Sequence, residues 1–157
     1  MTDKDREATT GKGMLPPTYL LLAIVAMAAL RLVLPGSRFI HFPWMLLGLA
    51  PAGLGVVLNL LADGAFKRHQ TTVKPFETST TLVVDGAYAI SRHPMYLGFT
   101  LILLGLALFL GAVTPFLVVP VFALLMEFKF IRVEEPMMAA TFGDAWHAYQ
   151  AKVRRWI

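Results

Sequence analysis

The sequence predicts an all-α membrane protein with four transmembrane helices and an amphipathic helix at the cytoplasmic C-terminus. The chain has 157 residues, of which 57% are hydrophobic and 15% charged, and its mean hydropathy is +0.63. Long apolar stretches alternate with short segments rich in Pro, Gly and charged residues. Residues 94–126 contain no formally charged side chain, and this stretch is longer than one membrane crossing requires. We expect a single integral-membrane domain over residues 14–157.

The first helix is predicted over residues 14–34, after a mobile cytoplasmic tail of residues 1–13. Pro16 and Pro17 suit the first turn of a helix, where a missing N–H is not needed. Arg31 lies near the far end of this helix, from which its long side chain can reach water. The tail lacks the compact basic region and the cleavage site of a secretory signal peptide.

The second helix is predicted over residues 44–62, which is long enough to span a membrane. Gly48, Ala52 and Gly55 share one face of this helix, and such a face of small residues usually indicates close helix packing. The Gly-x-Gly at residues 53–55 follows no strand, so it is not a phosphate loop. Whether Gly53-Leu54-Gly55 contacts a bound ligand stays open.

The third and fourth helices are predicted as a tight antiparallel pair over residues 94–111 and 115–135. One helix from residue 94 to residue 126 would be about 50 Å long, against a hydrocarbon core of about 30 Å. The Gly- and Pro-containing segment 111–115 provides the turn. Residues 63–93 form a polar, basic loop before this pair.

A surface helix is predicted over residues 143–155. Its apolar residues Trp146, Tyr149, Val153 and Trp156 are spaced three, four and three apart, and basic residues gather at its end. This pattern is typical of an amphipathic helix that lies on a membrane surface.

The distribution of positive charge predicts the orientation. The tail holds three Lys or Arg residues, the polar loop four and residues 129–157 five, whereas Arg31 and Arg38 alone fall on the opposite side. We therefore expect an integral multi-pass membrane protein with both termini and the polar loop in the cytoplasm. Membrane orientation also accounts for the net charge of +4, so no nucleic-acid partner is expected.

The chain has no cysteine, which excludes disulfides, thiolate metal ligands and a cysteine nucleophile. Its four histidines are widely scattered, and no metal site is expected.

The polar stretch at residues 86–98 marks the point where the chain enters the membrane. Pro94 suits the start of a helix and pushes His93 out of the α region. A helix start leaves N–H groups free and carries a partial positive field. Together with Arg92, this stretch can hold an anionic or polyhydroxylated ligand, although Arg, His and Tyr are also common interface anchors of membrane helices.

A second polar cluster, Arg132-Val133-Glu134-Glu135, lies on the predicted cytoplasmic extension of the fourth helix. Its two adjacent acids form either a solvated face or a ligand-binding pair. Pro136 follows them directly and is expected to kink or restart the helix.

The spacing of these two clusters is distinctive. The chain carries Gly86-x-Tyr88-x-x-x-Arg92-His93-Pro94-x-Tyr96-x-Gly98, then Arg132-x-Glu134-Glu135, six residues, Phe142-Gly143, Tyr149 and Val153-x-Arg155. Over residues 72–155 this pattern resembles the isoprenylcysteine carboxyl methyltransferase and phospholipid methyltransferase superfamily. Trp146, where the relatives usually have Tyr, and Pro136 after the acids depart from the pattern.

The resemblance implies an integral-membrane enzyme that uses S-adenosylmethionine to methylate a lipophilic acceptor, a small molecule or lipid-linked, at the cytoplasmic interface. Glu134 and Glu135 would accept hydrogen bonds from the cofactor's ammonium and ribose groups, and Arg92 and His93 would bind its carboxylate. Arg92 is the candidate catalytic residue, because it can orient an acidic acceptor. The other implied cofactor-binding residues are Tyr88, Pro94, Tyr96 and Gly98, with Trp146 as a further wall for adenine.

Two other classes of protein remain open. Membrane sterol-type reductases share a similar C-terminal core and bind NADPH, although the Glu134-Glu135 pair suits a phosphate-rich ligand poorly. A scaffold or transporter is the other alternative, but a transporter should carry polar groups at the membrane midplane, where only Asn59 and Thr100 come near. The acceptor (a prenylcysteine, a phospholipid amine, or a small lipophilic thiol or acid), the use of a general base and the oligomeric state also stay open.

Overall fold

The structure, a computed structural model, describes residues 14–34, 36–69 and 81–157. Its elements are α2 (Pro16–Val33), the 3-10 helix η1 (Trp44–Gly48), α3 (Leu49–Arg68), the 3-10 helix η2 (Gly86–Ala89), α4 (Pro94–Leu110), α5 (Val113–Met126), the π-helix η3 (Glu127–Ile131), α6 (Arg132–Phe142) and α7 (Asp144–Lys152). The predicted tail of residues 1–13, and residues 70–80 of the predicted polar loop, lie outside the described residues.

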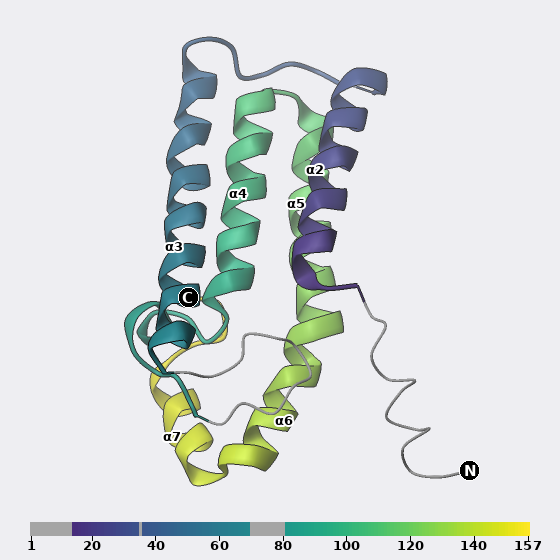
Figure 1. The fold of residues 1–157 in the computed structure, drawn as a ribbon. Coiled ribbons are helices and arrows are strands. Elements are labelled where there is room, and N and C mark those ends of the chain that lie inside the picture. The colour runs from purple at the N-terminus through teal and green to yellow at the C-terminus, as the bar shows by residue number, and fades with distance from the viewer. Residues whose placement is uncertain (1–13, 35, 70–80) are drawn as a thin grey trace, which may run out of the picture.

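Helix α4 occupies the centre of the molecule, with α3 on one side and α2 and α5 on the other (Figure 1). Its buried side chains Phe99 and Leu103 pack with Met27 of α2 and with Phe122 and Met126 of α5 in one apolar cluster. At one end, α5 continues through η3 into α6, and α7 then returns towards the start of α4 (Figure 1). This return brings the C-terminal residues beside the segment that precedes α4.

Helices α3 and α4 approach closely along glycines. A Cβ at Gly98 would collide with the side chain of Asn59 and the carbonyl of Gly55, and a Cβ at Gly105 would collide with the carbonyl of Gly48. The predicted face of small residues therefore packs against another helix. A Cβ at Gly53 would meet no neighbouring atom within 4 Å, whereas a Cβ at Gly55 would collide with the carbonyl of Gly98. The two glycines of residues 53–55 therefore differ, because Gly55 packs against α4 and Gly53 does not.

These glycines allow a matched test of the helix packing. We expect Gly105→Ala to lower the free energy of unfolding by about 1–3 kcal/mol, the usual cost of overpacking. The control Gly53→Ala is expected to be neutral or to stabilise by up to about 1 kcal/mol, because alanine is the better helix former. Thermal unfolding of both purified variants in detergent measures the difference, and equal shifts would contradict the close packing.

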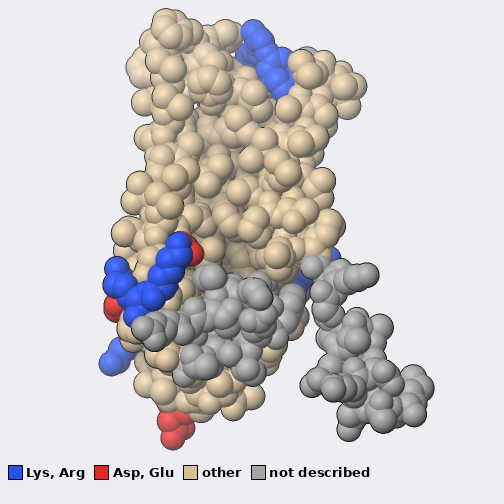
Figure 2. Space-filling model, in the orientation of Figure 1, with Lys and Arg blue, Asp and Glu red and all other residues tan. Residues whose placement is uncertain are grey.

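The outer faces of the helices carry large apolar side chains. Leu21 and Val25 of α2, Leu60 of α3, and Leu117 and Val121 of α5 are all more than half exposed. Figure 2 shows the consequence on one face, where charged side chains gather towards the two ends and a broad uncharged region separates them. Such an extended apolar surface is not tolerated in water, and it matches the surface of a membrane protein.

In the part of the chain that the structure describes, two helices are long and apolar enough to cross a membrane: Pro16–Val33 and Trp44–Arg68, the latter comprising η1 and α3. The apolar helix Pro94–Leu110 is shorter, with 17 residues. The count of four spanning helices and the orientation therefore remain predictions.

The predicted helix boundaries agree with the structure at some positions and differ at others. Helix α4 begins at Pro94, as predicted, and Gly111 with φ +65° ends it. The second helix continues beyond residue 62 to Arg68. The fourth helix begins at Val113 and continues through η3 and α6, past its predicted end at residue 135. Pro136 lies one turn inside α6 and does not end the helix, and the irregular turn of the helix is η3. Such π-turns are frequent at functional sites.

The C-terminal helix differs most from its prediction. Helix α7 ends at Lys152 rather than at residue 155, and Val153 after it has an extended backbone. Its aromatic residues Trp146 and Tyr149 are buried in the protein, at 3% and 7% exposure. The hydroxyl of Tyr149 donates to the carbonyl of Tyr88 at 2.6 Å. The aromatic stripe thus packs against the segment before α4, and it is not free to lie in a lipid surface.

Candidate functional site

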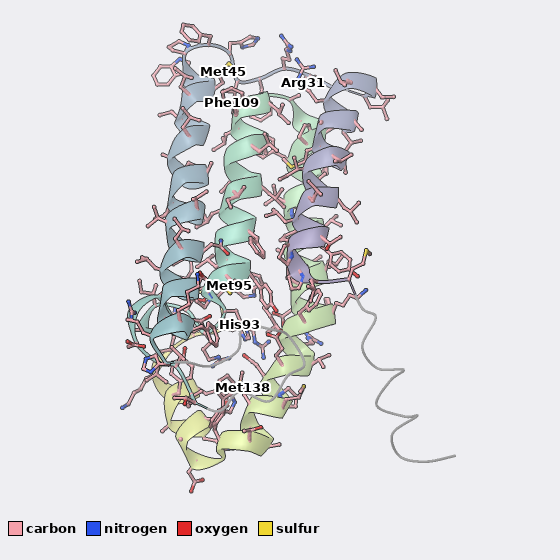
Figure 3. The ribbon with its side chains drawn as sticks, viewed as in Figure 1. Arg31, Met45, His93, Met95, Phe109 and Met138 are labelled. Carbon is pink, nitrogen blue, oxygen red and sulfur yellow. The ribbon has the colours of Figure 1, made fainter. Side chains whose placement is uncertain are left out.

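The start of α4 is shaped by the three residues before it. His93 occupies the N-cap position with φ −126°, and Pro94 is the first helical residue. The buried hydroxyl of Ser91 accepts the backbone N–H of His93 at 3.2 Å and donates to the carbonyl of Arg155 at 3.1 Å. The start of α4 is therefore fixed to the C-terminal segment, at the end of the molecule where Figure 3 also labels Met138 of α6.

Arg92 connects three distant segments of the chain. Its Nε and Nη2 donate to Oε1 of Glu135 at 3.1 and 2.8 Å. Its Nη1 donates to the carbonyls of Val153 at 3.1 Å and Gln150 at 3.4 Å. Its backbone N–H donates to the carbonyl of Arg154 at 3.0 Å. Arg92 is thus an internal hub, and it is not a solvated interface anchor.

Glu135 is the anionic centre of this hub. It is 6% exposed, and Arg155 donates to both of its oxygens, through Nε to Oε1 at 3.1 Å and through Nη2 to Oε2 at 2.5 Å. Nε2 of His93 lies 3.3 Å from Oε1. Burial raises the pKa of Glu135, but the hydrogen bonds from His93 and Arg155 and the charge of Arg92 outweigh burial, so this pKa lies far below its usual range. Glu135 is therefore a carboxylate at any physiological pH.

The neighbouring acid, Glu134, has a different environment. Its Oε1 accepts a hydrogen bond from the hydroxyl of Tyr96 at 2.5 Å, and its Oε2 lies 3.7 Å from Nδ1 of His93. The ring of His93 stacks on that of Tyr96 with centroids 5.8 Å apart. Burial raises the pKa of Glu134 above its ordinary value, although the Tyr96 hydrogen bond and the nearby His93 oppose that rise.

A third acid, Glu127 of η3, extends the cluster. Its Oε1 accepts from Nη1 of Arg155 at 2.7 Å and from Nε of Arg132 at 3.4 Å, and its Oε2 accepts from the indole of Trp156 at 3.2 Å. Sequence reasoning missed Glu127 and gave Arg155 no partner. The Val-x-Arg motif near the C-terminus was the available signal for Arg155, but nothing in the pattern names its two carboxylates.

An open pocket of ≈ 560 Å³ lies beside the hub. It is lined by Arg132, Glu135, Pro136, Ala139, Trp146, Gln150 and Arg155. Trp146 is almost fully buried, the guanidinium of Arg92 lies 5.9 Å from its ring centroid, and its indole N–H has no hydrogen-bond partner among the described residues. A buried donor without a partner costs free energy unless a ligand satisfies it.

Of the predicted site residues, Glu135 and Trp146 belong to this pocket lining, and the others lie outside it. Tyr88 is buried beside Phe66, with ring centroids 5.3 Å apart, and burial raises the pKa of its hydroxyl. Gly98 faces Asn59 of α3, and Pro94 is buried at the first turn of α4. The structure thus brings Arg92, His93, Tyr96, Glu134 and Glu135 into one network, and Pro94 and Gly98 are buried residues of α4. In the described ranges, no group of three or more His, Cys, Asp or Glu residues could hold a metal ion.

Comparisons with known proteins converge on one family. A family model described as phospholipid methyltransferase matches residues 43–145. The chain is 40% identical over 76 residues to a protein-S-isoprenylcysteine O-methyltransferase of Schizosaccharomyces pombe, and the match covers 46% of this chain and 30% of that protein. It is 41% identical over 63 residues to an uncharacterised protein of Haemophilus influenzae, covering 40% of this chain and 100% of that one.

The fold is also similar to a solved structure. The eukaryotic intramembrane Ras methyltransferase ICMT (isoprenylcysteine carboxyl methyltransferase) superposes with a TM-score of 0.66 at 27% identity, over 90% of this chain and 52% of that one. The chain thus spans about half the length of this enzyme, and less than a third of the Schizosaccharomyces pombe relative.

Proposed function

Since the chain belongs to the phospholipid methyltransferase family, we propose that it transfers a methyl group from S-adenosylmethionine to a lipophilic acceptor at the cytoplasmic face of a membrane. One observation carries the proposal: residues from the two sequence motifs meet in a single hydrogen-bonded network, Arg92–Glu135 and Tyr96–Glu134, beside an open pocket. The reductase and the non-enzymatic alternatives gain no comparable support, because the family model, the Schizosaccharomyces pombe relative and the solved structure name methyltransferases.

The pocket suits the proposed cofactor in size and in chemistry. Its ≈ 560 Å³ falls within the range of about 300–1,000 Å³ that is usual for small-molecule sites. The unpartnered indole N–H of Trp146 and the guanidinium groups of Arg132 and Arg155 offer donors for a carboxylate, and the amide of Gln150 can donate or accept. Glu135 offers the acceptor for an ammonium. These donors differ from the predicted ones, Arg92 and His93, because neither of those two residues lines the pocket.

Each remaining candidate residue has a role in the proposal. Glu134 and Tyr96 face the reacting groups, whereas Tyr88 supports the site from its buried position behind the network. Pro94 fixes where α4 begins, and Gly98 lets α3 approach α4. When bound, the cofactor supplies an electrophilic methyl group. The protein's contribution is to position the acceptor in line with that group and to exclude water, which is the main source of acceleration for such a displacement.

Arg92 retains one donor with which to act on an acceptor. A guanidinium has five N–H bonds, and those on Nε, on Nη1 and one on Nη2 point to partners in the described structure. The remaining Nη2 N–H is available to an acidic group of the acceptor. We propose that Arg92 orients the acceptor through this donor while its other donors hold the site together.

The proposed orientation in the membrane rests on the end of the molecule at which the network lies. The network and the C-terminus lie together, and the basic residues of the polar loop and of residues 129–157 are expected on the cytoplasmic side. We propose four spanning helices, both termini in the cytoplasm, and an acceptor that reaches the site from the lipid.

A binding measurement separates the proposal from its alternatives. Titration of the purified, full-length protein with S-adenosylhomocysteine and with NADPH, followed by calorimetry, is expected to show saturable binding of the first compound only. Binding of NADPH alone would support a reductase, and binding of neither would contradict an enzyme that uses either cofactor.

A further inference from the structure

A cation and a hydroxyl group meet on the outer side of the molecule, where α2 begins and α5 ends. Nζ of Lys129 in η3 donates to the hydroxyl of Tyr19 in the first turn of α2. The same ammonium lies 4.8 Å from the centroid of the Tyr19 ring. The start of α2 thus lies beside the junction of α5 and η3 (Figure 1). Lys129 and Tyr19 are called the α2–η3 pair below.

The apolar core fixes the position of this pair. The ring of Tyr19 makes an edge contact with the ring of Phe130, with centroids 5.7 Å apart, and Phe130 is almost fully buried. Lys129 directly precedes Phe130 in η3, and its own side chain is exposed. The ammonium and the hydroxyl are therefore presented together at one defined place on the surface.

The α2–η3 pair carries more donors than the described structure uses. An ammonium has three N–H bonds and a tyrosine hydroxyl has one O–H bond. Lys129 spends one N–H on the Tyr19 oxygen. In the described ranges, no carboxylate forms an ion pair with Lys129, and no acceptor receives the O–H of Tyr19. An ammonium that donates to a hydroxyl also polarises the O–H of that hydroxyl outward.

We propose that the α2–η3 pair binds the phosphate of an anionic phospholipid. A phosphate group offers negative charge and acceptor oxygens, which matches a cluster of donors with one positive charge. A zwitterionic lipid would bring its own cation, for which the pair has no carboxylate. The inference goes beyond the proposed function and does not depend on methyl transfer, because this lipid is a bound neighbour of the protein and not the methyl acceptor.

The surroundings of the pair favour a lipid over a soluble anion. Phe128, next to Lys129, is 57% exposed. Leu15 and Leu22, about one turn to either side of Tyr19, are also more than half exposed. A soluble phosphate would leave this apolar surface uncovered, whereas the acyl chains of a lipid would bury it, which is favourable. The pair therefore has the chemistry of a head-group site at the edge of the apolar region.

The test measures lipid binding directly. Purified full-length protein in detergent is titrated with dioleoylphosphatidylglycerol or dioleoylphosphatidylcholine, and native mass spectrometry counts the lipids bound to each folded molecule. We expect the wild type to bind the anionic lipid more tightly. Lys129→Gln is expected to lose about fivefold or more of this affinity, the size of one basic residue at an anionic surface. Tyr19→Phe keeps the ring and the lysine and is expected to lose about two- to tenfold, the size of one hydrogen bond.

Lys67→Gln is the matched control. Lys67 also lies at the end of a membrane-crossing helix and is 76% exposed, but Asp63 pairs with it at 2.6 Å. We expect its affinity for the anionic lipid to stay within about twofold of wild type, and Lys129→Arg, which keeps the charge, to retain most of that affinity.

Four results would overturn the inference. These are equal affinity of the wild type for the two lipids, unchanged affinity in Lys129→Gln, an equal loss in Lys67→Gln, and displacement of the anionic lipid by an excess of inorganic phosphate. The last result would assign the donors of the pair to a soluble anion. All four would leave the proposed function standing, because none of them measures methyl transfer.

Discussion

Replacing Arg92 with Lys is expected to lower turnover at saturating cofactor by about 100-fold per folded molecule, because a displacement of roughly 1 Å is enough for such a loss. Lysine keeps the positive charge but not the planar fork. One ammonium cannot reach Glu135 and the carbonyls of Gln150 and Val153 together, as the guanidinium does. Turnover with labelled cofactor, normalised to folded protein, measures the effect.

The matched control is Arg154→Lys. Arg154 is exposed and contributes its backbone carbonyl, which the substitution retains, to Arg92. We expect its turnover to stay within about twofold of wild type. Near-normal turnover in Arg92→Lys would leave Arg92 with only a structural role in joining Glu135 to the C-terminal segment. Loss of cofactor affinity with normal saturated turnover would place it on the cofactor.

Replacing Glu135 with Gln is expected to lower the free energy of unfolding by about 3–5 kcal/mol, the cost of breaking a buried ion pair. Arg92 would lose its carboxylate partner Glu135, Arg155 would keep only Glu127, and the C-terminal segment would lose its ion pair with α6. Affinity for S-adenosylhomocysteine is expected to fall ten- to a hundredfold, as for the loss of about 1.5–3 kcal/mol of a charge-assisted contact. Thermal unfolding and calorimetry measure the two effects separately.

Glu127→Gln provides the comparison for this variant. Glu127 also pairs with Arg155, but that arginine is 37% exposed and retains Glu135 as a partner. Pairs of this kind contribute about 0–1 kcal/mol, so we expect a small change in stability. Equal losses in the two variants would contradict a hub centred on Glu135, and an unchanged affinity in Glu135→Gln would remove Glu135 from the cofactor site.

Much of the fold follows from local sequence. Proline and glycine mark where α4 begins and ends, because their backbone constraints act without help from distant residues. The small residues of the second helix predicted close packing, although the partner, Gly98 and Gly105 of α4, came only from the structure. The predicted end of the fourth helix at residue 135 was wrong. Pro136 lies one turn inside α6 without ending it, and the preceding turn, η3, is a π-helix.

The C-terminal segment shows the limit of periodicity. Trp146 and Tyr149 have the spacing of an amphipathic helix, but spacing cannot distinguish a lipid surface from a protein surface. In the structure these rings face the segment before α4. Their burial follows from the return of α7 beneath α4, a tertiary arrangement that no window of sequence encodes.

The residues of the candidate site could be predicted from the sequence, but the contacts between them could not. Arg92, His93, Glu134 and Glu135 belong to recognisable motifs, and the structure joins them. The structure pairs Glu135 with both Arg92 and Arg155, and it pairs Glu134 with Tyr96. These contacts join residues that are 20 to 43 positions apart in the sequence. The different chemistry of the two acids therefore appears only when the chain is folded.

The most direct test of the account measures methyl transfer itself. Purified full-length protein in nanodiscs is incubated with S-adenosylmethionine labelled in its methyl group and a mixture of lipophilic amines, thiols and carboxylic acids, and the label in the organic phase is counted. The account predicts transfer by the wild type and a loss of about 100-fold in Arg92→Lys. Folded protein that transfers no label to any of the three classes would contradict it.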